Sequence, residues 1–269
     1  MSKIWIPLSI IAMYASLLSV MYVLQPKMIF LPTQLPQTYA FSFPNPFDEH
    51  FIQVPDAQIH ALSFQHKDIQ PEGLVIYFHG NAGCLDGWGD VYRYFWYYGY
   101  DTFIIDYRGY GKSTGTIKSE EQLFDDAQHV YLYIQQKFGD RYKNNIVIYG
   151  RSIGTGIASR LAQKFPPKLL ILETPYYNLP SLVQDIYPFV PKFLVRFHLA
   201  NHKYIQKTTY PVHIFHGTSD EIIPYKHGIK LSRLSQNITL HTIDSAYHNN
   251  IPTHKKYHQI LQSILKEKD

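Results

Sequence analysis

The amino-acid sequence predicts an α/β fold with a mostly parallel sheet and helices on both of its faces. Short apolar runs rich in β-branched residues alternate with segments of helical periodicity, which is the pattern of successive strand–helix–strand units. The strand-like runs are Ile52–Phe64, Leu74–Phe78, Thr102–Ile105, Asn145–Tyr149, Leu169–Leu172, Val212–Phe215 and Ile238–Ile243. The 269 residues are enough for one large domain, and a single cysteine, Cys84, excludes an internal disulfide.

The N-terminal segment is predicted to be a transmembrane helix. Residues Ile4–Leu24 carry no charge and are long enough to cross a hydrocarbon core of ~30 Å. We assign residues 1–25 to a single-pass signal-anchor. Lys3 and the terminal amine favour a cytoplasmic N-terminus and an exported (periplasmic or extracytoplasmic) catalytic domain. A cleaved signal peptide is the alternative, but its apolar core usually has about 7–15 residues, and no small-x-small site follows this longer run.

Residues 26–50 are proline-rich and are predicted to form an extended linker that packs onto a domain of residues 51–269. In that domain Ile52–Phe64 is expected to form the leading antiparallel strands. Ser119 and Gln122 form a capping box at the start of a helix. Its apolar positions recur at helical spacing and are Leu123, Ala127, Val130, Tyr131 and Ile134. The other expected helices are Thr155–Lys164, Tyr225–Leu234 and Ile251–Lys266.

Residues 175–209 are expected to form a short helical cap between two strands of the sheet. Their large apolar side chains outnumber those that one helix face buries: Tyr176, Tyr177, Leu182, Val183, Ile186, Tyr187, Phe189, Val190, Phe193, Leu194 and Phe197. Packing of one apolar face on the core is one explanation. The surplus of aromatic residues favours a second explanation, in which some of them line an acyl pocket or touch a membrane.

Charge and spacing argue against several functions. A net charge of +4 is too small and too dispersed for nucleic-acid binding. His254 and His258 have the helical spacing of zinc ligands but no third ligand nearby, so no metal is expected. The run Gly109–Thr114 is similar to a phosphate loop, but Asp106 stands where the first glycine is required. No cofactor is therefore predicted, and Asp106 and Arg108 are interpreted as a pair that braces the loop.

The strand Asn145–Tyr149 ends in the pattern G-x-S-x-G, read as Gly150-Arg151-Ser152-Ile153-Gly154. Such a pattern makes a sharp strand-to-helix turn that exposes the serine hydroxyl in a cleft. The two glycines leave room where any Cβ would clash. We therefore predict Ser152 as a nucleophile.

A serine hydroxyl needs a base that takes its proton and an acid that orients the base. Asp220 follows the strand Val212–Phe215, and His248 follows the strand Ile238–Ile243. The chain order serine, acid, histidine is the one that accompanies G-x-S-x-G. We predict Asp220 as the acid and His248 as the base. Glu173, which follows the strand Leu169–Leu172, is the alternative acid.

An oxyanion hole is expected where Leu74–Phe78 leads into His79-Gly80-Asn81-Ala82-Gly83. The backbone amides of Asn81 and Ile153 are predicted to face the negative charge that develops on the substrate. Losing one such donor typically costs about 3–4 kcal/mol of transition-state stabilisation. His79 is interpreted as a structural brace of this loop.

Five motifs in this order resemble those of the α/β-hydrolase superfamily: Phe78–Gly83 (FHGNAG), Asp106–Ser113 (DYRGYGKS), Gly150–Gly156 (GRSIGTG), Glu173–Pro175 (ETP) and His216–Asp220 (HGTSD). The resemblance covers nearly the whole chain after the N-terminal segment. It is greatest to the branch of single-pass, membrane-anchored hydrolases, which includes protein depalmitoylases, lysophosphatidylserine lipases and serine-aminopeptidase-like proteins. That branch usually has a glycine before the catalytic histidine, where this chain has Tyr247.

The resemblance implies an α/β-hydrolase fold with an eight-stranded type of sheet and a short cap. It also implies a serine hydrolase that cleaves acyl esters or thioesters, as carboxylesterases, lysophospholipases and depalmitoylases do. The expected partners are a small-molecule or lipid acyl substrate and, through the N-terminal helix, a membrane. A serine peptidase of the aminopeptidase type is the alternative, although the cap offers only Asp185 for a substrate amine. A non-enzymatic protein of this fold would not need the complete triad.

Overall fold

The structure is a computed structural model that describes residues 2–142 and 145–266, and it is built around an eight-stranded sheet. The strands lie in the order β10-β9-β8-β7-β4-β6-β3-β2. Their bounds are Phe47–Val54 (β2), Ala57–Phe64 (β3), Gly73–Phe78 (β4), Tyr100–Ile105 (β6), Ile146–Arg151 (β7), Leu169–Glu173 (β8), Val212–Gly217 (β9) and Ile238–Ile243 (β10). The β2–β3 and β3–β6 pairs are antiparallel, and the other pairs are parallel. The predicted mostly parallel sheet is confirmed.

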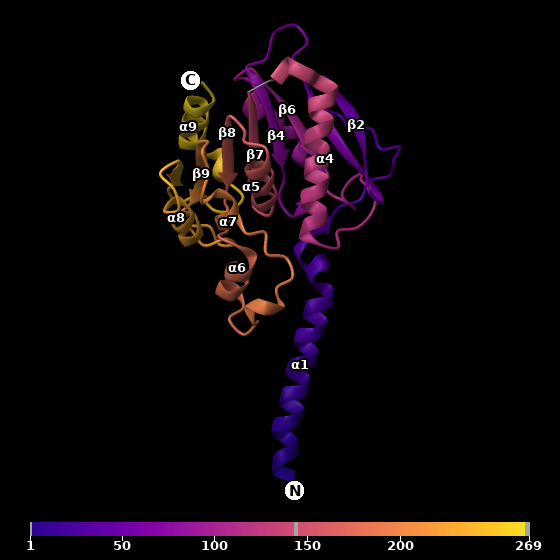
Figure 1. The fold of residues 1–269 in the computed structure, drawn as a ribbon, viewed down its shortest axis with the longest axis vertical. Coiled ribbons are helices and arrows are strands. Elements are labelled where there is room, and N and C mark those ends of the chain that lie inside the picture. The colour runs from indigo at the N-terminus through magenta and orange to yellow at the C-terminus, as the bar shows by residue number, and fades with distance from the viewer. Residues whose placement is uncertain (1, 143–144, 267–269) are drawn as a thin grey trace.

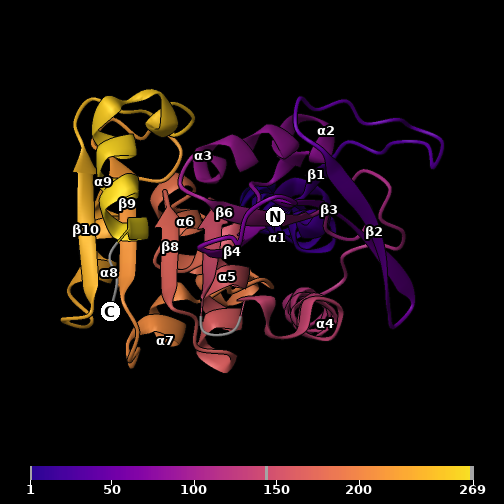
Figure 2. The same ribbon diagram turned by 90° about the horizontal axis from the view of Figure 1, so that it is seen from above.

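Helices cover both faces of this sheet. Figure 2 shows α2, α3 and α9 on one face and α4 and α5 on the other. Their bounds, with the remaining helices, are α1 (Ser2–Ile29), α2 (Leu85–Trp88), α3 (Arg93–Trp96), α4 (Glu120–Phe138), α5 (Gly154–Lys164), α6 (Leu179–Ile186), α7 (Asn201–Ile205), α8 (Lys226–Ser232) and α9 (Lys255–Lys266). Each face of the sheet has its own hydrophobic core, because successive strand residues point to opposite faces. Ile76 of β4 packs in the core that includes Ile157 of α5, and Tyr77 packs in the core that includes Tyr257 of α9.

Local sequence signals set several helix ends. The Ser119 hydroxyl accepts a hydrogen bond from the Gln122 amide at 3.2 Å, so the serine half of the predicted capping box begins α4. The Gln122 side chain accepts the Lys118 amide at 2.9 Å instead of the Ser119 amide. The predicted helix Ile251–Lys266 is divided, because His254 has an extended backbone (φ −86°, ψ 129°). A 3₁₀ turn, Ile251–Thr253, precedes it and α9 follows it.

The predicted pairing of Asp106 with Arg108 is wrong. The Arg108 guanidinium instead forms two hydrogen bonds with the Asp126 carboxylate of α4, at 2.6 and 2.7 Å. Asp106 accepts the Leu85 amide at 3.1 Å. The chain turns after Tyr107, so Arg108 meets a helix 18 residues further along, a contact that the local sequence does not reveal.

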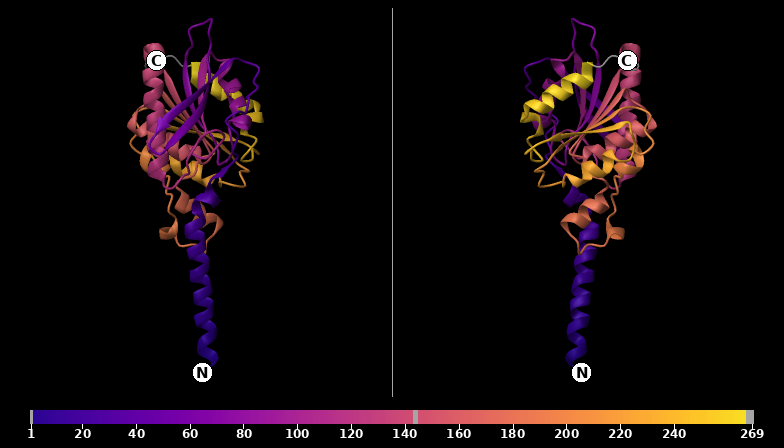
Figure 3. Two further views of the ribbon diagram at one scale, coloured as in Figure 1. Left: turned by 90° about the vertical axis from the view of Figure 1, so that its right-hand side faces the viewer. Right: turned by 90° about the vertical axis from the view of Figure 1, so that its left-hand side faces the viewer.

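Helix α1 projects from the end of the sheet at which the cap lies, and it runs beside α6 (Figures 1 and 3). Its stretch Ser9–Ile29 is long and apolar enough to cross a membrane, by length and composition. The helix continues to Ile29, beyond the expected boundary at residue 25. The chain then forms β1 (Leu31–Pro32), which pairs in parallel with β5 (Ala82–Gly83), and it enters the main sheet at Phe47, still within the expected linker.

Candidate active site

The turn between β7 and α5 carries Ser152. Its φ of +52° is unusual for a residue with a side chain, so the backbone is strained at this point. The tight turn depends on glycines. A Cβ on Gly150 would lie 2.7 Å from the Ala158 Cβ, and one on Gly154 would lie 2.3 Å from the Phe78 carbonyl oxygen. The Ser152 amide donates to the Glu173 carbonyl at 2.9 Å, which fixes the turn to β8.

Ser152, His248 and Asp220 lie in one chain of hydrogen bonds. His248 Nε2 is 3.1 Å from Ser152 Oγ, and His248 Nδ1 is 3.0 Å from Asp220 Oδ2. With the Nδ1 proton donated to the carboxylate, Nε2 is free to accept the serine hydroxyl. The structure therefore brings together three residues that the sequence places 68 and 28 positions apart (220 − 152 and 248 − 220).

Several donors hold Asp220 in its ionised form. Its carboxylate accepts the amides of Ile222 and Ile223, at 3.0 and 2.8 Å, and lies 3.3 Å from His216 Nε2. Burial opposes ionisation, but the hydrogen bonds from His216 and His248 outweigh it and hold the pKa of Asp220 well below its usual range. Asp220 thus presents a fixed negative charge to the imidazole of His248.

Glu173, the alternative acid, has different partners. It is buried at the end of β8, where it accepts the Tyr149 hydroxyl and forms an ion pair with Arg151 Nε at 3.1 Å. Its backbone carbonyl holds the Ser152 amide. The Glu173 side chain therefore braces the floor of the turn, whereas Asp220 contacts the imidazole of His248.

The loop after β4 lies opposite the Ser152 turn. The Asn81 carbonyl accepts the Leu31 amide at 2.9 Å and the Tyr110 hydroxyl at 2.6 Å. The His79 carbonyl accepts the Tyr107 hydroxyl at 2.7 Å. Within residues 2–142 and 145–266, the amides of Asn81 and Ile153 donate no hydrogen bond to another protein group. Both amides remain available to a ligand.

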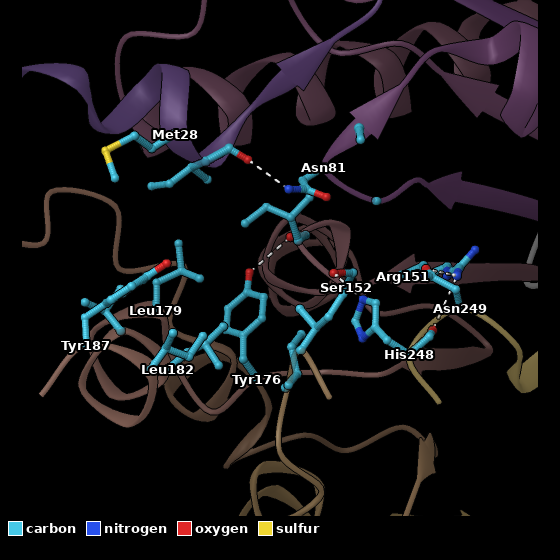
Figure 4. A pocket seen from close by; sticks show the side chains of 18 of the residues that line it. Met28, Asn81, Arg151, Ser152, Tyr176, Leu179, Leu182, Tyr187, His248 and Asn249 are labelled. Carbon is cyan, nitrogen blue, oxygen red and sulfur yellow. Dashed lines mark hydrogen bonds between the residues drawn. The ribbon is translucent and has the colours of Figure 1, made fainter. Parts of the chain in front are cut away.

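A cavity of about 420 Å³ opens above Ser152 (Figure 4). The loop after β4 and the cap supply about half of its lining residues, including Asn81, Tyr176, Leu179, Leu182, Val183 and Tyr187. Met28 and Ile29, in the last turn of α1, add to the apolar wall. The sequence does not reveal the contribution of α1, because nothing in the N-terminal pattern distinguishes these two residues from other apolar residues of the helix.

Arg151 directly precedes Ser152 and contacts four other residues around the cavity. Besides Glu173, its guanidinium contacts the Asn249 side chain at 3.1 Å and the His248 carbonyl at 3.4 Å. It also lies 4.9 Å from the centre of the Trp88 ring, a cation–π distance. The sequence does not single out Arg151, because its partners are up to 98 residues away.

The chain matches several known proteins. A family model described as "Serine aminopeptidase, S33" (Hydrolase_4) matches residues 69–204. The lysophosphatidylserine lipase ABHD12 of Macaca fascicularis is 33% identical over 179 residues, which are 59% of this chain and 44% of that protein. The α/β hydrolase domain-containing protein 17B of Homo sapiens is 32% identical over 166 residues, 61% of this chain and 56% of that protein. The chain thus spans about half the length of the curated relatives it matches.

Solved structures of other hydrolases share the fold. An esterase of Pyrococcus furiosus has a TM-score of 0.69 at 16% identity, and the match covers 87% of this chain and 97% of that one. The ferulic-acid-bound Est1E of Butyrivibrio proteoclasticus has a TM-score of 0.63 at 19% identity, over 81% and 96% of the two chains. The predicted α/β-hydrolase fold is confirmed, and the chain belongs to the serine aminopeptidase S33 family of the α/β-hydrolase superfamily.

Proposed function

We propose that this protein is a serine hydrolase that cleaves acyl esters or thioesters of lipids at a membrane. The hydrogen-bonded series from Ser152 through His248 to Asp220, open to an apolar cavity, is the observation that carries the proposal. The names of the similar proteins, which include a lysophosphatidylserine lipase and esterases, agree with ester hydrolysis. The mainly apolar cavity wall suits the acyl part of a substrate.

In the proposed mechanism Ser152 Oγ attacks the acyl carbonyl carbon while His248 Nε2 takes the serine proton. The amides of Asn81 and Ile153 donate to the resulting oxyanion. The bond from carbon to the leaving oxygen or sulfur breaks, and His248 returns the proton to that atom. Water, deprotonated by His248, then attacks the acyl-enzyme, so that the carboxylic acid leaves and Ser152 regains its proton. Asp220 stabilises the imidazolium in both steps.

The proposed arrangement assigns residues 1–25 to a membrane anchor, 26–50 to a linker, 51–269 to the catalytic domain and 175–209 to its cap. The positive charge at Lys3 supports an exported catalytic domain. Protease added to spheroplasts, in which no outer membrane shields a periplasmic domain, should then degrade the catalytic domain. Protection of the domain until the spheroplasts are lysed would contradict this orientation.

Aminopeptidase activity is the second candidate, favoured by the description of the matching family model. An aminopeptidase needs a carboxylate for the substrate amine. The cavity wall supplies none among the described residues. Asp185, the acidic residue of the cap, is already paired with Lys226 at 2.8 Å and His227 at 3.0 Å. These contacts favour ester hydrolysis.

The decisive experiment measures hydrolysis of p-nitrophenyl esters from acetate to palmitate by the full-length protein in detergent micelles. Aminoacyl-nitroanilides serve as the peptidase comparison. We expect ester turnover that is lost in Ser152→Ala, together with fluorophosphonate labelling that requires Ser152. Turnover of the nitroanilides without the esters would support the peptidase, and full esterase activity in Ser152→Ala would exclude the proposed mechanism.

A further inference from the structure

We infer that an apolar groove between α1 and the cap is the channel through which the acyl chain of a bilayer lipid reaches Ser152. The inference rests on the proposed ester hydrolysis and specifies its substrate as a lipid that stays in the membrane during cleavage. Its occupant is one acyl chain, which enters sideways from the bilayer.

A second cavity, of about 170 Å³, lies between α1 and the cap. Leu18, Met21 and Tyr22 of α1 line one side, and Val190 and Leu194 of the cap line the other. The first cavity and this one have lining residues in common, namely Met28, Ile29, Val183 and Tyr187. The space around Ser152 is therefore bordered by the same side chains as the groove that follows α1 away from the sheet.

The two walls of the groove are attached to each other. The Gln25 side chain donates to the Leu194 carbonyl at 2.6 Å and accepts the Arg196 amide at 2.7 Å. Further along α1, the Tyr14 hydroxyl donates to the Phe189 carbonyl at 2.6 Å. Gln25 uses both atoms of its amide on the cap, so the polar group inside an apolar groove is satisfied. Apart from Gln25, whose polar atoms are bonded to the cap, the side chains that line the groove are mainly apolar.

The position of the groove on α1 indicates where the lipid comes from. The stretch long enough to span a membrane, Ser9–Ile29, contains every α1 residue that lines the groove. From Met28 to Leu18 the helix rises ~15 Å, so the groove runs along a substantial part of one leaflet. A chain already aligned with α1 in that leaflet lies parallel to the groove.

The outer surface of the cap fits the same leaflet. Phe189 and Phe193 of the cap are 52% and 83% exposed, and the Phe189 carbonyl accepts the Tyr14 hydroxyl of α1. Lys192 and Arg196 are close by in sequence, and such side chains can extend from apolar surroundings to charged head groups. The cap is attached to Tyr14 and Gln25, which lie within the stretch of α1 that is long enough to span a membrane. The exposed aromatic residues of the cap therefore meet lipid tails instead of water. The bilayer is thus continuous with the open side of the groove.

Met21→Trp in the full-length protein, reconstituted in phosphatidylcholine vesicles, tests the channel. The added ring fills the groove at a distance from Ser152. Hydrolysis of p-nitrophenyl palmitate should fall about tenfold or more, while hydrolysis of p-nitrophenyl acetate, which needs only the cavity at Ser152, stays unchanged. Val20→Trp is the matched control: Val20 is 55% exposed on the neighbouring position of the same helix, and its substitution should change neither rate.

The outcomes separate the two proposals. Equal palmitate turnover in Met21→Trp and Val20→Trp, or an equal loss of both esters in Met21→Trp alone, would overturn the channel but leave ester hydrolysis intact. A wild-type protein that hydrolyses neither ester would overturn the proposed function, and the channel with it.

A covalent probe tests the path without any substitution. A fluorophosphonate with a long alkyl chain and a terminal diazirine reacts at Ser152: the serine oxygen bonds to phosphorus, fluoride leaves, and His248 takes the proton. Illumination then links the chain end to its neighbours. We expect cross-links within residues 18–29 and 183–195, read by mass spectrometry. Cross-links confined to other parts of the cavity wall, such as Trp88 or Ile222, would contradict the channel.

Discussion

The Leu31 amide donates a hydrogen bond to the Asn81 carbonyl at 2.9 Å, so the segment that leaves α1 is paired with the loop that carries the proposed oxyanion donor. The Thr33 amide repeats the contact with the Gly83 carbonyl at 2.9 Å. The two residue pairs Leu31–Ala82 and Pro32–Gly83 form the short β1–β5 ladder. The segment that follows α1 is thus attached to the loop beside Ser152, in addition to any role that α1 has in a membrane.

Replacing Leu31 by proline should misplace the oxyanion loop, because proline has no amide proton to donate. We expect kcat for p-nitrophenyl acetate to fall roughly 10–100-fold, since small displacements of catalytic groups have effects of that size. Leu31 is 49% exposed, so Leu31→Ala keeps the amide at little packing cost and serves as the control. Equal kcat in the two variants would show that the contact is dispensable.

Asp220→Asn and Glu173→Gln distinguish the two candidate acids. Removing the charge that orients His248 should lower kcat by about 10⁴-fold, as in other serine triads. Glu173→Gln keeps the size of a side chain that braces the Ser152 turn, so its kcat should change far less. Steady-state ester kinetics of both variants decide the matter, and the reverse order of effects would assign the acid to Glu173.

Arg151→Met should destabilise the fold, because it leaves the Glu173 carboxylate buried without its ionic partner. Breaking a buried pair on one side typically costs about 3–5 kcal/mol. Urea unfolding followed by circular dichroism measures the loss. The double variant Arg151→Met, Glu173→Gln removes the orphaned charge and should recover part of it. No recovery in the double variant would mean that packing against Trp88, rather than charge, is what Arg151 supplies.

Mild acid should weaken the fold through His50. This residue is buried between Ser63 and Tyr133, and burial, with the nearby charge of Lys137, lowers its pKa to about 4. The unfolded chain takes up this proton near its ordinary pKa of about 6.5. Stability is therefore complete above that pH and is lost as the pH falls towards 4, by roughly 2 kcal/mol at pH 5.

The comparison for this prediction is His50→Gln, a variant without the titrating group. Its unfolding free energy should depend less on pH between 7 and 5 than that of the wild-type protein. Parallel pH profiles for the two proteins would sink the assignment to His50.

Gly154→Ala should fold poorly. Its Cβ would lie 2.3 Å from the Phe78 carbonyl oxygen and 2.6 Å from that of His79, and backbone atoms cannot move aside easily. We expect a loss of about 1–3 kcal/mol or more. Gly87→Ala is the control, because its Cβ would meet nothing within 4 Å. Thermal unfolding of the two variants provides the measurement, and similar Tm values would refute the steric argument.

Sequence patterns predict the parts of this fold that depend on neighbours along the chain. The apolar runs before Ser152, Asp220 and His248 form β7, β9 and β10, since alternation of strand and helix is a local signal. The Ser119 cap begins α4 for the same reason. The positions of the three side chains follow because parallel strands bring their carboxyl ends to one edge of the sheet.

Contacts between distant segments are not predictable in this way. The pairing of Leu31 with Ala82, the ion pair of Arg108 with Asp126 and the presence of Met28 in the cavity wall all depend on tertiary packing. No periodicity or motif marks these residues. Asp106 and Arg108 are two positions apart in sequence, yet one contacts the start of α2 and the other contacts α4.

The side-chain hydrogen bonds of Tyr14 and Gln25 to the cap have a consequence for the engineering of this protein. The two residues are eleven positions apart, about three helical turns, so they recur on the same side of α1. An unrelated apolar helix of equal length would match the hydropathy of α1 yet lack this spacing. Helix α1 is therefore not an interchangeable apolar segment: replacing it with another would remove the two polar contacts that attach it to the cap.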